Sequence, residues 1–112
     1  MTSLTAPTGI PRHVPQASEA DLRSQSMRVR SDSVTVRIEL GFTLCRVVET
    51  EYLAGEKTLA RRVLERVRRQ HEFICEHVEM PNFVLPSLLP ELRKRLSELE
   101  NRIRLLDVRI PK

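Results

Sequence analysis

The 112-residue sequence contains few aromatic residues and few glycines. It has no tryptophan, one tyrosine, three phenylalanines and three glycines. A glycine-rich loop around a bound phosphate is therefore excluded, because such a loop needs several glycines close together. The sequence also has no paired carboxylates and no nucleophile–base pair at a spacing typical of a cleft. We therefore expect a protein that is not an enzyme and that uses no cofactor.

Long apolar runs are absent as well. No stretch approaches the roughly 18–20 apolar residues of a membrane span. The N-terminus lacks the apolar segment of a secretory signal. We therefore expect a cytoplasmic location and no interaction with a membrane.

The two cysteines, Cys45 and Cys75, are not expected to form a disulfide within one chain. In a helical hairpin that turns near Gly55, Cys45 lies level with Glu65, ten residues away from Cys75. Ten residues of helix span about 15 Å, whereas a disulfide accepts a Cα separation of roughly 4.4–6.8 Å. Reduced thiols are typical of a cytosolic protein, and pairing between two chains stays open.

The composition predicts one globular domain preceded by a tail. Hydrophobic residues make up 40% of the chain and charged residues 30%, which is ordinary for a folded domain. Residues 1–32 have sparse, aperiodic apolar residues and contain three prolines, Pro7, Pro11 and Pro15. This segment is predicted to be a disordered tail, in which Ser18 and Asp21 would cap at most a single helical turn. The folded part is then 33–112.

Residues 34–53 carry two competing patterns. Alternate residues are apolar from Val34 to Leu44, which is typical of a half-buried strand. The same stretch also has an apolar stripe at helical spacing: Val34, Ile38, Gly41, Cys45, Val48 and Tyr52. The helical stripe continues where the alternation ends, and no second strand is available for pairing. We therefore predict a helix over 34–53, with a strand left open for residues 34–40.

Two more helices are predicted, over about 57–79 and 88–109. Gly55 suits the end of the first helix, and Pro81 disfavours helix in the residue before it. The apolar stripe of the second helix is Ala60, Leu64, Val67, His71, Ile74 and Val78, and that of the third is Leu92, Leu96, Leu99, Ile103, Leu106 and Ile110. The predicted fold is all-α, an antiparallel three-helix bundle made of a helical hairpin and a third helix.

The third predicted helix has acidic residues four positions before arginines. This order favours ion pairs along the surface of a helix. The expected pairs are Glu91–Arg95, Glu98–Arg102 and Glu100–Arg104.

The first predicted helix is apolar around most of its circumference, and we expect it to contact more than one neighbour. A folded part of about 75 residues has a small core, for which association between copies is a common remedy. Gly41 permits a close approach of another backbone. A homodimer is therefore possible, with self-association through Leu40, Gly41, Leu44 and Val47.

The run from Leu44 to Val67 resembles a single tetratricopeptide-repeat unit. Residues at matching spacing are Leu44, Val47, Gly55, Ala60 and Leu64, with Tyr52 one place off. The run departs from the repeat pattern at Val48 and Val67, and no second copy follows. It is also similar to small bacterial helical proteins in which a glycine turn precedes an alanine- and arginine-rich helix. The resemblance implies a helical hairpin of the kind used as a protein-binding scaffold, and no activity.

Residues 71–77 hold the densest group of metal-ligand side chains. His71 and Cys75 are four residues apart on one helical face, but a structural zinc site needs two further ligands. His13 and Cys45 have no spacing that recommends them. Because His71 falls on the apolar stripe, we expect it to be buried with one hydrogen-bond partner, and no metal to bind.

Arginines dominate the first half of the second predicted helix. Arg62, Arg66, Arg69 and Phe73 share a face away from the apolar stripe. This face is either simply solvated or a docking site for an acidic protein; a phosphate backbone is the less favoured ligand, because Glu65, Glu72 and Glu76 are interleaved. The predicted function is a non-enzymatic protein–protein interaction or assembly module. A nucleic-acid-binding protein and a zinc-binding structural protein are the alternatives.

Overall fold

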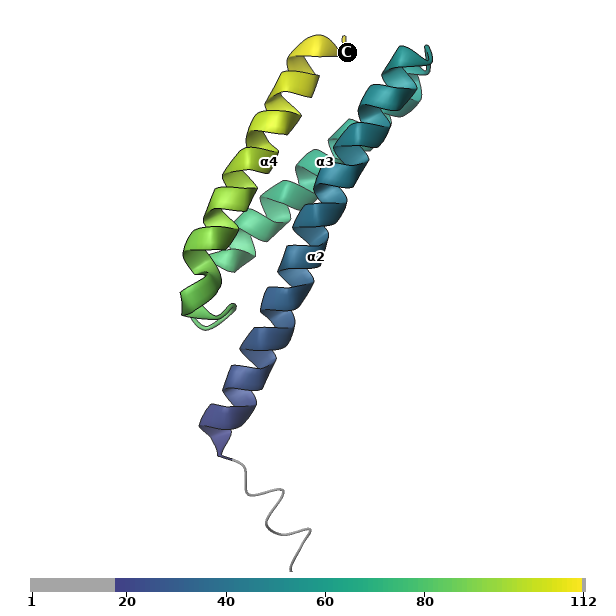
Figure 1. Ribbon diagram of the computed structural model, residues 1–112. Coiled ribbons are helices and arrows are strands. Elements are labelled where there is room, and N and C mark those ends of the chain that lie inside the picture. Colours follow the sequence, from purple (N-terminus) through teal and green to yellow (C-terminus); the bar gives the residue numbers. More distant parts are fainter. Residues whose placement is uncertain (1–17, 112) are drawn as a thin grey trace, which may run out of the picture.

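The computed structural model describes residues 18–111, and this part of the chain is helical without any strand. The α-helices are α2 (Glu19–Leu53), α3 (Lys57–Val78) and α4 (Leu89–Arg109), and a 3-10 helix, η3 (Pro86–Leu88), precedes α4 (Figure 1). The prediction of an all-α fold with three helices is confirmed, and residues 34–44 are helix. None of the described helices is long and apolar enough to cross a membrane.

Consecutive helices run in opposite directions. A short turn at Gly55, whose φ of 89° is in the left-handed region, reverses the chain between α2 and α3. Figure 1 shows α3 returning along α2, and α4 running back beside both. Ion pairs between the helices agree with these directions. Residue numbers increase together along α2 and α4, as the pairs Glu39–Arg95 and Glu49–Arg102 show. The pair Arg61–Asp107 joins the start of α3 to the end of α4.

The core lies along one stripe of each helix, as the helical spacing predicted. The α2 stripe is buried against both other helices, and Val84 of the α3–α4 connection closes one end of the core. The buried hydrophobic residues are Val34, Ile38, Cys45, Val48, Ala60, Leu64, Val67, Ile74, Val78, Val84, Leu92, Leu96, Leu99, Ile103, Leu106 and Ile110.

Gly41 of α2 lies directly against the side chain of Leu99 of α4. A Cβ atom at this position would lie 2.8 Å from Cδ2 of Leu99, which is shorter than any normal contact between carbon atoms. Leu99 itself is 1% exposed. The glycine therefore makes room for a leucine of α4 inside the same chain.

The prediction of a disordered tail over 1–32 is wrong for residues 18–32, because α2 begins at Glu19. The hydroxyl of Ser18 accepts a hydrogen bond from the amide of Asp21 and caps this helix. Starting a helix is costly but extending one is not, so the packed part of α2 supports further turns that have almost no apolar residues to bury. Residues 1–17 of the predicted tail lie outside the described part.

The connection between α3 and α4 is bound to α2 through two side chains. Arg30 donates hydrogen bonds to the carbonyls of Phe83 and Asn82, at 2.6 and 2.8 Å. The buried hydroxyl of Ser31 accepts from the amide of Leu85 at 2.9 Å. The connection contains η3 and a tight turn at Asn82, whose φ is 61°.

Candidate functional site

The four predicted partner-binding residues share the outer face of α3. Because they recur at steps of four and three, they lie opposite the buried stripe of the same helix. Phe73 is 52% exposed and the three arginines are also exposed. The structure therefore brings together Arg62, Arg66, Arg69 and Phe73, which we call the arginine–phenylalanine patch.

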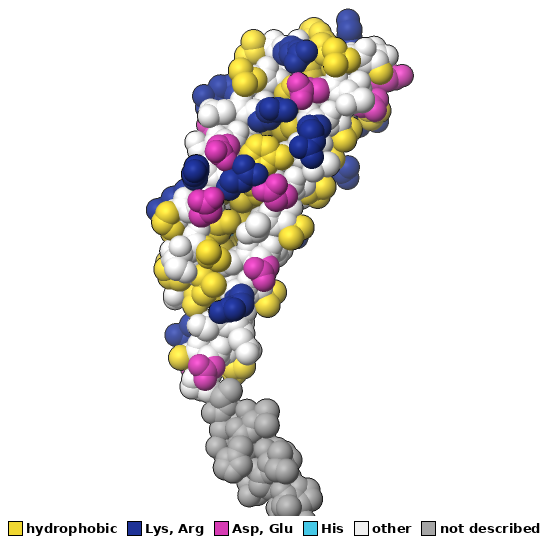
Figure 2. Space-filling model, viewed as in Figure 1, with side chains coloured by type: hydrophobic (Ala, Val, Ile, Leu, Met, Phe, Trp, Pro, Cys, Tyr) yellow, Lys and Arg dark blue, Asp and Glu magenta, His cyan; other side chains and the backbone are white. Residues whose placement is uncertain are grey.

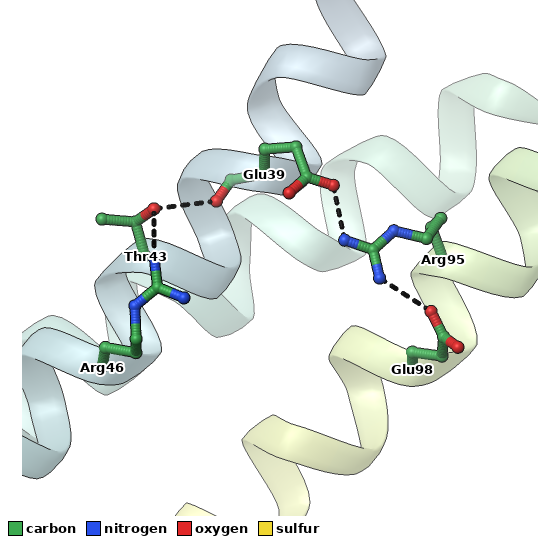
Figure 3. A network of polar contacts seen from close by, with 5 residues as sticks. All are labelled: Glu39, Thr43, Arg46, Arg95 and Glu98. Atoms are coloured by element: carbon green, nitrogen blue, oxygen red, sulfur yellow. Dashed lines mark hydrogen bonds and ion pairs between the residues drawn. The ribbon is translucent and has the colours of Figure 1, made fainter.

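The arginines of the patch have no carboxylate partner among the described residues. Apart from Arg23 at the start of α2, the ion-paired arginines lie on α4 or reach a carboxylate on it: Arg61, Arg68, Arg93, Arg95, Arg102, Arg104 and Arg109. Arg95, for example, contacts both Glu39 of α2 and Glu98 of its own helix (Figure 3). Positive charge is thus compensated around α4 and uncompensated on the outer face of α3.

Figure 2 shows the contrasting face, on which α2 and α4 are seen side by side. Basic and acidic side chains alternate over it and flank hydrophobic side chains between the two helices. Within this seam the guanidinium of Arg95 lies 4.3 Å from the ring centroid of Phe42. Charges of both signs are therefore interspersed on this face.

Phe73 belongs to an aromatic cluster at one end of the patch. The ring centroids of Phe73 and His77 lie 4.0 Å apart, and those of His77 and Phe83 lie 5.8 Å apart. Nδ1 of His77 donates to the carbonyl of Phe73, and Arg30 covers the Phe83 ring at 5.3 Å from its centroid. The cluster joins α2, α3 and the α3–α4 connection.

The cluster borders a groove of about 210 Å³, to which α4 contributes no lining residue. We call it the aromatic groove. Its lining residues are Arg30, Ser33, Val34, Arg37, Phe73, Ile74, His77 and Phe83.

Most residues of this groove were not predicted from the sequence. The spacing of four between Phe73 and His77 was the available signal for that pair. Arg30 was missed because it was assigned to the tail. Phe83 lies ten residues beyond Phe73, and only the reversal of the chain at Asn82 returns it to the same place.

The four residues predicted for self-association do not share one surface. Leu40 and Val47 are 45% and 38% exposed. Gly41 is instead buried against Leu99, and Leu44 is partly buried beside the core. The prediction is therefore wrong for Gly41, which serves packing within the chain, because a step from 40 to 41 turns the helix by about 100°.

His71 has the structural role that its place on the apolar stripe predicted. It is 8% exposed, and its Nε2 donates to the carbonyl of Leu96 at 3.0 Å. Sγ of Cys75 lies 3.6 and 3.9 Å from the two ring nitrogens. Across residues 18–111, no group of three or more histidine, cysteine or acidic side chains is placed to hold a metal ion, and His13 lies outside this range.

Both cysteines are free thiols; Cys45 is buried and Cys75 is partly buried. Burial raises the pKa of the Cys45 thiol to about 11. Burial is also the main cause that raises the pKa of Cys75, and the carboxylate of Glu100 adds to it. Neither side chain is therefore a thiolate at neutral pH, which is the form required for nucleophilic attack or metal binding.

Asp107 should make the stability of the bundle depend on pH. Contact with the guanidinium of Arg68, and secondly with that of Arg61, lowers the pKa of Asp107 below its ordinary value. A lowered folded-state pKa contributes stability above the unfolded-state pKa of about 3.9, and this contribution is lost as the pH falls through the folded-state value. The urea concentration at the midpoint of unfolding is expected to fall less at acid pH in Asp107→Asn than in the unmodified protein.

Glu76→Gln is the control for that measurement, because Glu76 is exposed and makes no ion pair with any described residue. Its midpoint should follow that of the unmodified protein at every pH. An equal fall of the urea midpoint at acid pH in Asp107→Asn and in the unmodified protein would contradict the role given to Asp107.

No family model, curated protein or solved structure matches this chain. The resemblance to a tetratricopeptide-repeat unit therefore stays a prediction. The helix pair that it implies is present as α2 and α3, but a helical hairpin is common to many folds.

Proposed function

We propose that this chain is a non-enzymatic protein-interaction module that binds an acidic protein surface through the arginine–phenylalanine patch. The observation that carries the proposal is the exposed Phe73 beside arginines without carboxylate partners, on a helix whose other arginines are paired. Arginine and aromatic side chains are the residues most enriched in the energetically dominant parts of protein interfaces. The aromatic groove beside Phe73 offers a place for an apolar side chain of the partner.

A protein partner is favoured over a phosphate backbone by the charges around the patch. Glu72 and Glu76 are exposed on the same helix and flank Arg69 and Phe73 in sequence. Carboxylates repel a continuous row of phosphates, whereas a protein surface can place basic side chains opposite them.

The proposal predicts that Arg66→Glu combined with Phe73→Ala abolishes partner binding without unfolding the chain. Both side chains point away from the core, so the helix content by circular dichroism should be unchanged. With immobilised protein as bait, recovery of an acidic protein from cell extract should fall at least about tenfold, because interface arginine and aromatic residues often contribute 2 kcal/mol or more.

Lys94→Glu with Leu105→Ala is the matched control. It makes the same change of charge and removes a similar apolar side chain, but on the outer surface of α4, where Leu105 is 69% exposed. The control should recover the partner normally. Equal recovery by both double variants and the unmodified protein would remove the patch from consideration.

Nucleic-acid binding is the second candidate, because Arg62, Arg66 and Arg69 supply charge that no described carboxylate neutralises. If these arginines bind phosphates, affinity for a labelled oligonucleotide should fall steeply as salt is raised. A weak response to salt, together with salt-tolerant capture of an acidic protein, would favour the protein partner.

A further inference from the structure

Helix α2 is apolar on two faces, of which the bundle covers one. The second face carries exposed apolar side chains at steps of seven, seven, four and seven residues: Leu22, Val29, Val36, Leu40 and Val47. Their mean direction is about 140° from that of the buried stripe of the same helix. We call this set the outer stripe; Val29 and Val36 are 67% and 66% exposed.

The outer stripe also runs along a part of α2 that projects from the bundle. Arg30 and Ser31 are the first side chains of α2 that bond to another element. Residues 19–29 therefore extend about 16 Å beyond these contacts, as the lower part of α2 in Figure 1 shows. Helical turns with few tertiary contacts gain stability from a partner helix, because most helical stability in proteins comes from packing.

We infer that the outer stripe packs against the outer stripe of a second copy, parallel and in register, so that two chains form a homodimer. The steps of seven and four are those of the d and a positions of a coiled coil. Leu22, Val29 and Val36 then occupy d positions, and Leu40 and Val47 occupy a positions. Each apolar layer meets its own counterpart in the partner.

Charge complementarity selects the parallel orientation. In a parallel coiled coil, the residue that precedes an a position lies close to one residue of the partner chain. That partner residue is five positions later in the sequence and follows a d position. Asp32 then faces Arg37 of the partner subunit, and Arg46 faces Glu51 of the partner subunit. The antiparallel register that matches the same apolar layers places Arg37 against Arg37 of the partner subunit.

Two polar layers of the stripe, those of Thr43 and Thr50, are compatible with burial. The hydroxyl of Thr43 donates to the carbonyl of Glu39 of its own helix at 3.2 Å (Figure 3). The hydroxyl of Thr50 donates to the carbonyl of Arg46 at 3.0 Å. Their hydrogen-bond donors are thus already satisfied, and burying them in a seam leaves no donor unpaired. Layers of this kind penalise shifted registers, in which a hydroxyl faces a leucine or valine.

The first experiment is the mass in solution by light scattering over a range of protein concentrations. The dimer is expected at about 26 kDa, twice the 13.0 kDa of one chain. Val36→Glu should raise the dimer Kd by at least about tenfold, because it buries a charge in the seam. Val108→Glu is the matched control, since Val108 is 83% exposed on α4. A monomer at every concentration, or equal Kd values for the two variants, would overturn the inference.

Charge reversal tests the flanking pairs. Arg46→Glu alone places two carboxylates together in the parallel dimer and should weaken it, as should Glu51→Arg alone. The double variant restores opposite charges and should restore the Kd. Failure of the double variant to recover, when its circular dichroism is normal, would overturn the parallel register.

Engineered cysteines distinguish the orientation directly. Ser26→Cys and Thr50→Cys, each alone, should form a cross-linked dimer under mild oxidation, because each layer meets itself in a parallel pair. An antiparallel pair would cross-link only when both cysteines are present, and this outcome would contradict the inference. The unmodified protein, with Cys45 buried and Cys75 partly buried, gives the background.

These variants lie on α2 and leave the arginine–phenylalanine patch unchanged. Loss of the dimer with normal capture of the acidic partner would therefore refute the homodimer alone. A normal dimer with no effect of the α3 variants on capture would refute only the proposed function.

Discussion

Leu99→Ala is expected to lower the free energy of unfolding by about 3 kcal/mol. Leu99 is 1% exposed, and its side chain lies against Gly41 of α2. Removing a buried leucine loses its transfer free energy and leaves a cavity that the surrounding helices fill only in part, at a typical cost of about 2–5 kcal/mol. Domains of this size have a total stability of roughly 5–15 kcal/mol, so a large share would be lost.

Urea unfolding followed by circular dichroism measures this change. The midpoint should fall while the slope stays constant, which is the sign of a change in stability alone. Leu105→Ala on the same helix is the control, because Leu105 is 69% exposed and surface substitutions usually change stability by at most about 0.5 kcal/mol. Similar losses in both variants would contradict the packing described for Leu99.

The contact with Gly41 adds a sharper test through a double variant. In the unmodified protein, Gly41→Ala gains about 1 kcal/mol of helix propensity but crowds Leu99, so its net effect should be small. In the Leu99→Ala background the crowding is gone, and Gly41→Ala should stabilise by about 1 kcal/mol. Additive effects at the two positions would show that they are not coupled.

Ser31→Ala is expected to cost about 2 kcal/mol. The Ser31 side chain is fully buried, accepts from the amide of Leu85 and donates to the carbonyl of Met27 at 2.7 Å. Alanine removes the acceptor and leaves the Leu85 amide without a partner, which costs about 1–3 kcal/mol for a buried group. The loss should be greatest in the α3–α4 connection, which this hydrogen bond ties to α2.

Hydrogen exchange and chemical unfolding together measure this effect. The Leu85 amide should exchange faster in Ser31→Ala, while amides in the middle of α2 keep their relative protection. Ser24→Ala is the matched control, because Ser24 is exposed on the same helix and should leave both measurements nearly unchanged. An unaltered exchange rate at Leu85 would show that the hydroxyl does not hold the connection.

Much of the fold could be predicted from local patterns. The ends of the helices beyond Gly55 agree with the prediction to within one residue, because glycine and proline restrict the backbone independently of distant contacts. The start of α2 could not be found in this way, because residues 19–33 have few apolar residues and are helical mainly as an extension of a packed helix. Ser18 and Asp21 were identified as a cap, but the helix they begin was predicted to be a single turn.

The ion pairs of α4 show where local spacing fails. Glu100 and Arg104 pair as predicted. Arg102 instead contacts Glu49 of α2. The third predicted pair is also replaced, because Arg95 contacts Glu39 and Glu98. Spacing along a helix names possible partners, whereas the neighbouring helix decides among them.

The scarcity of aromatic residues, noted first in the sequence, has a different meaning in three dimensions. From its residues alone the chain is a helical protein with a basic face on its second predicted helix, since periodicity and charge are local properties. Only the tertiary structure gathers Phe73, His77 and Phe83 into one cluster and leaves the neighbouring arginines without carboxylates. Only the tertiary structure also shows that Gly41 packs inside the chain, whereas the outer stripe of α2 stays exposed. The reason is that exposure depends on which helices pack together, and a helix that is apolar on two faces does not indicate which one its own chain will cover.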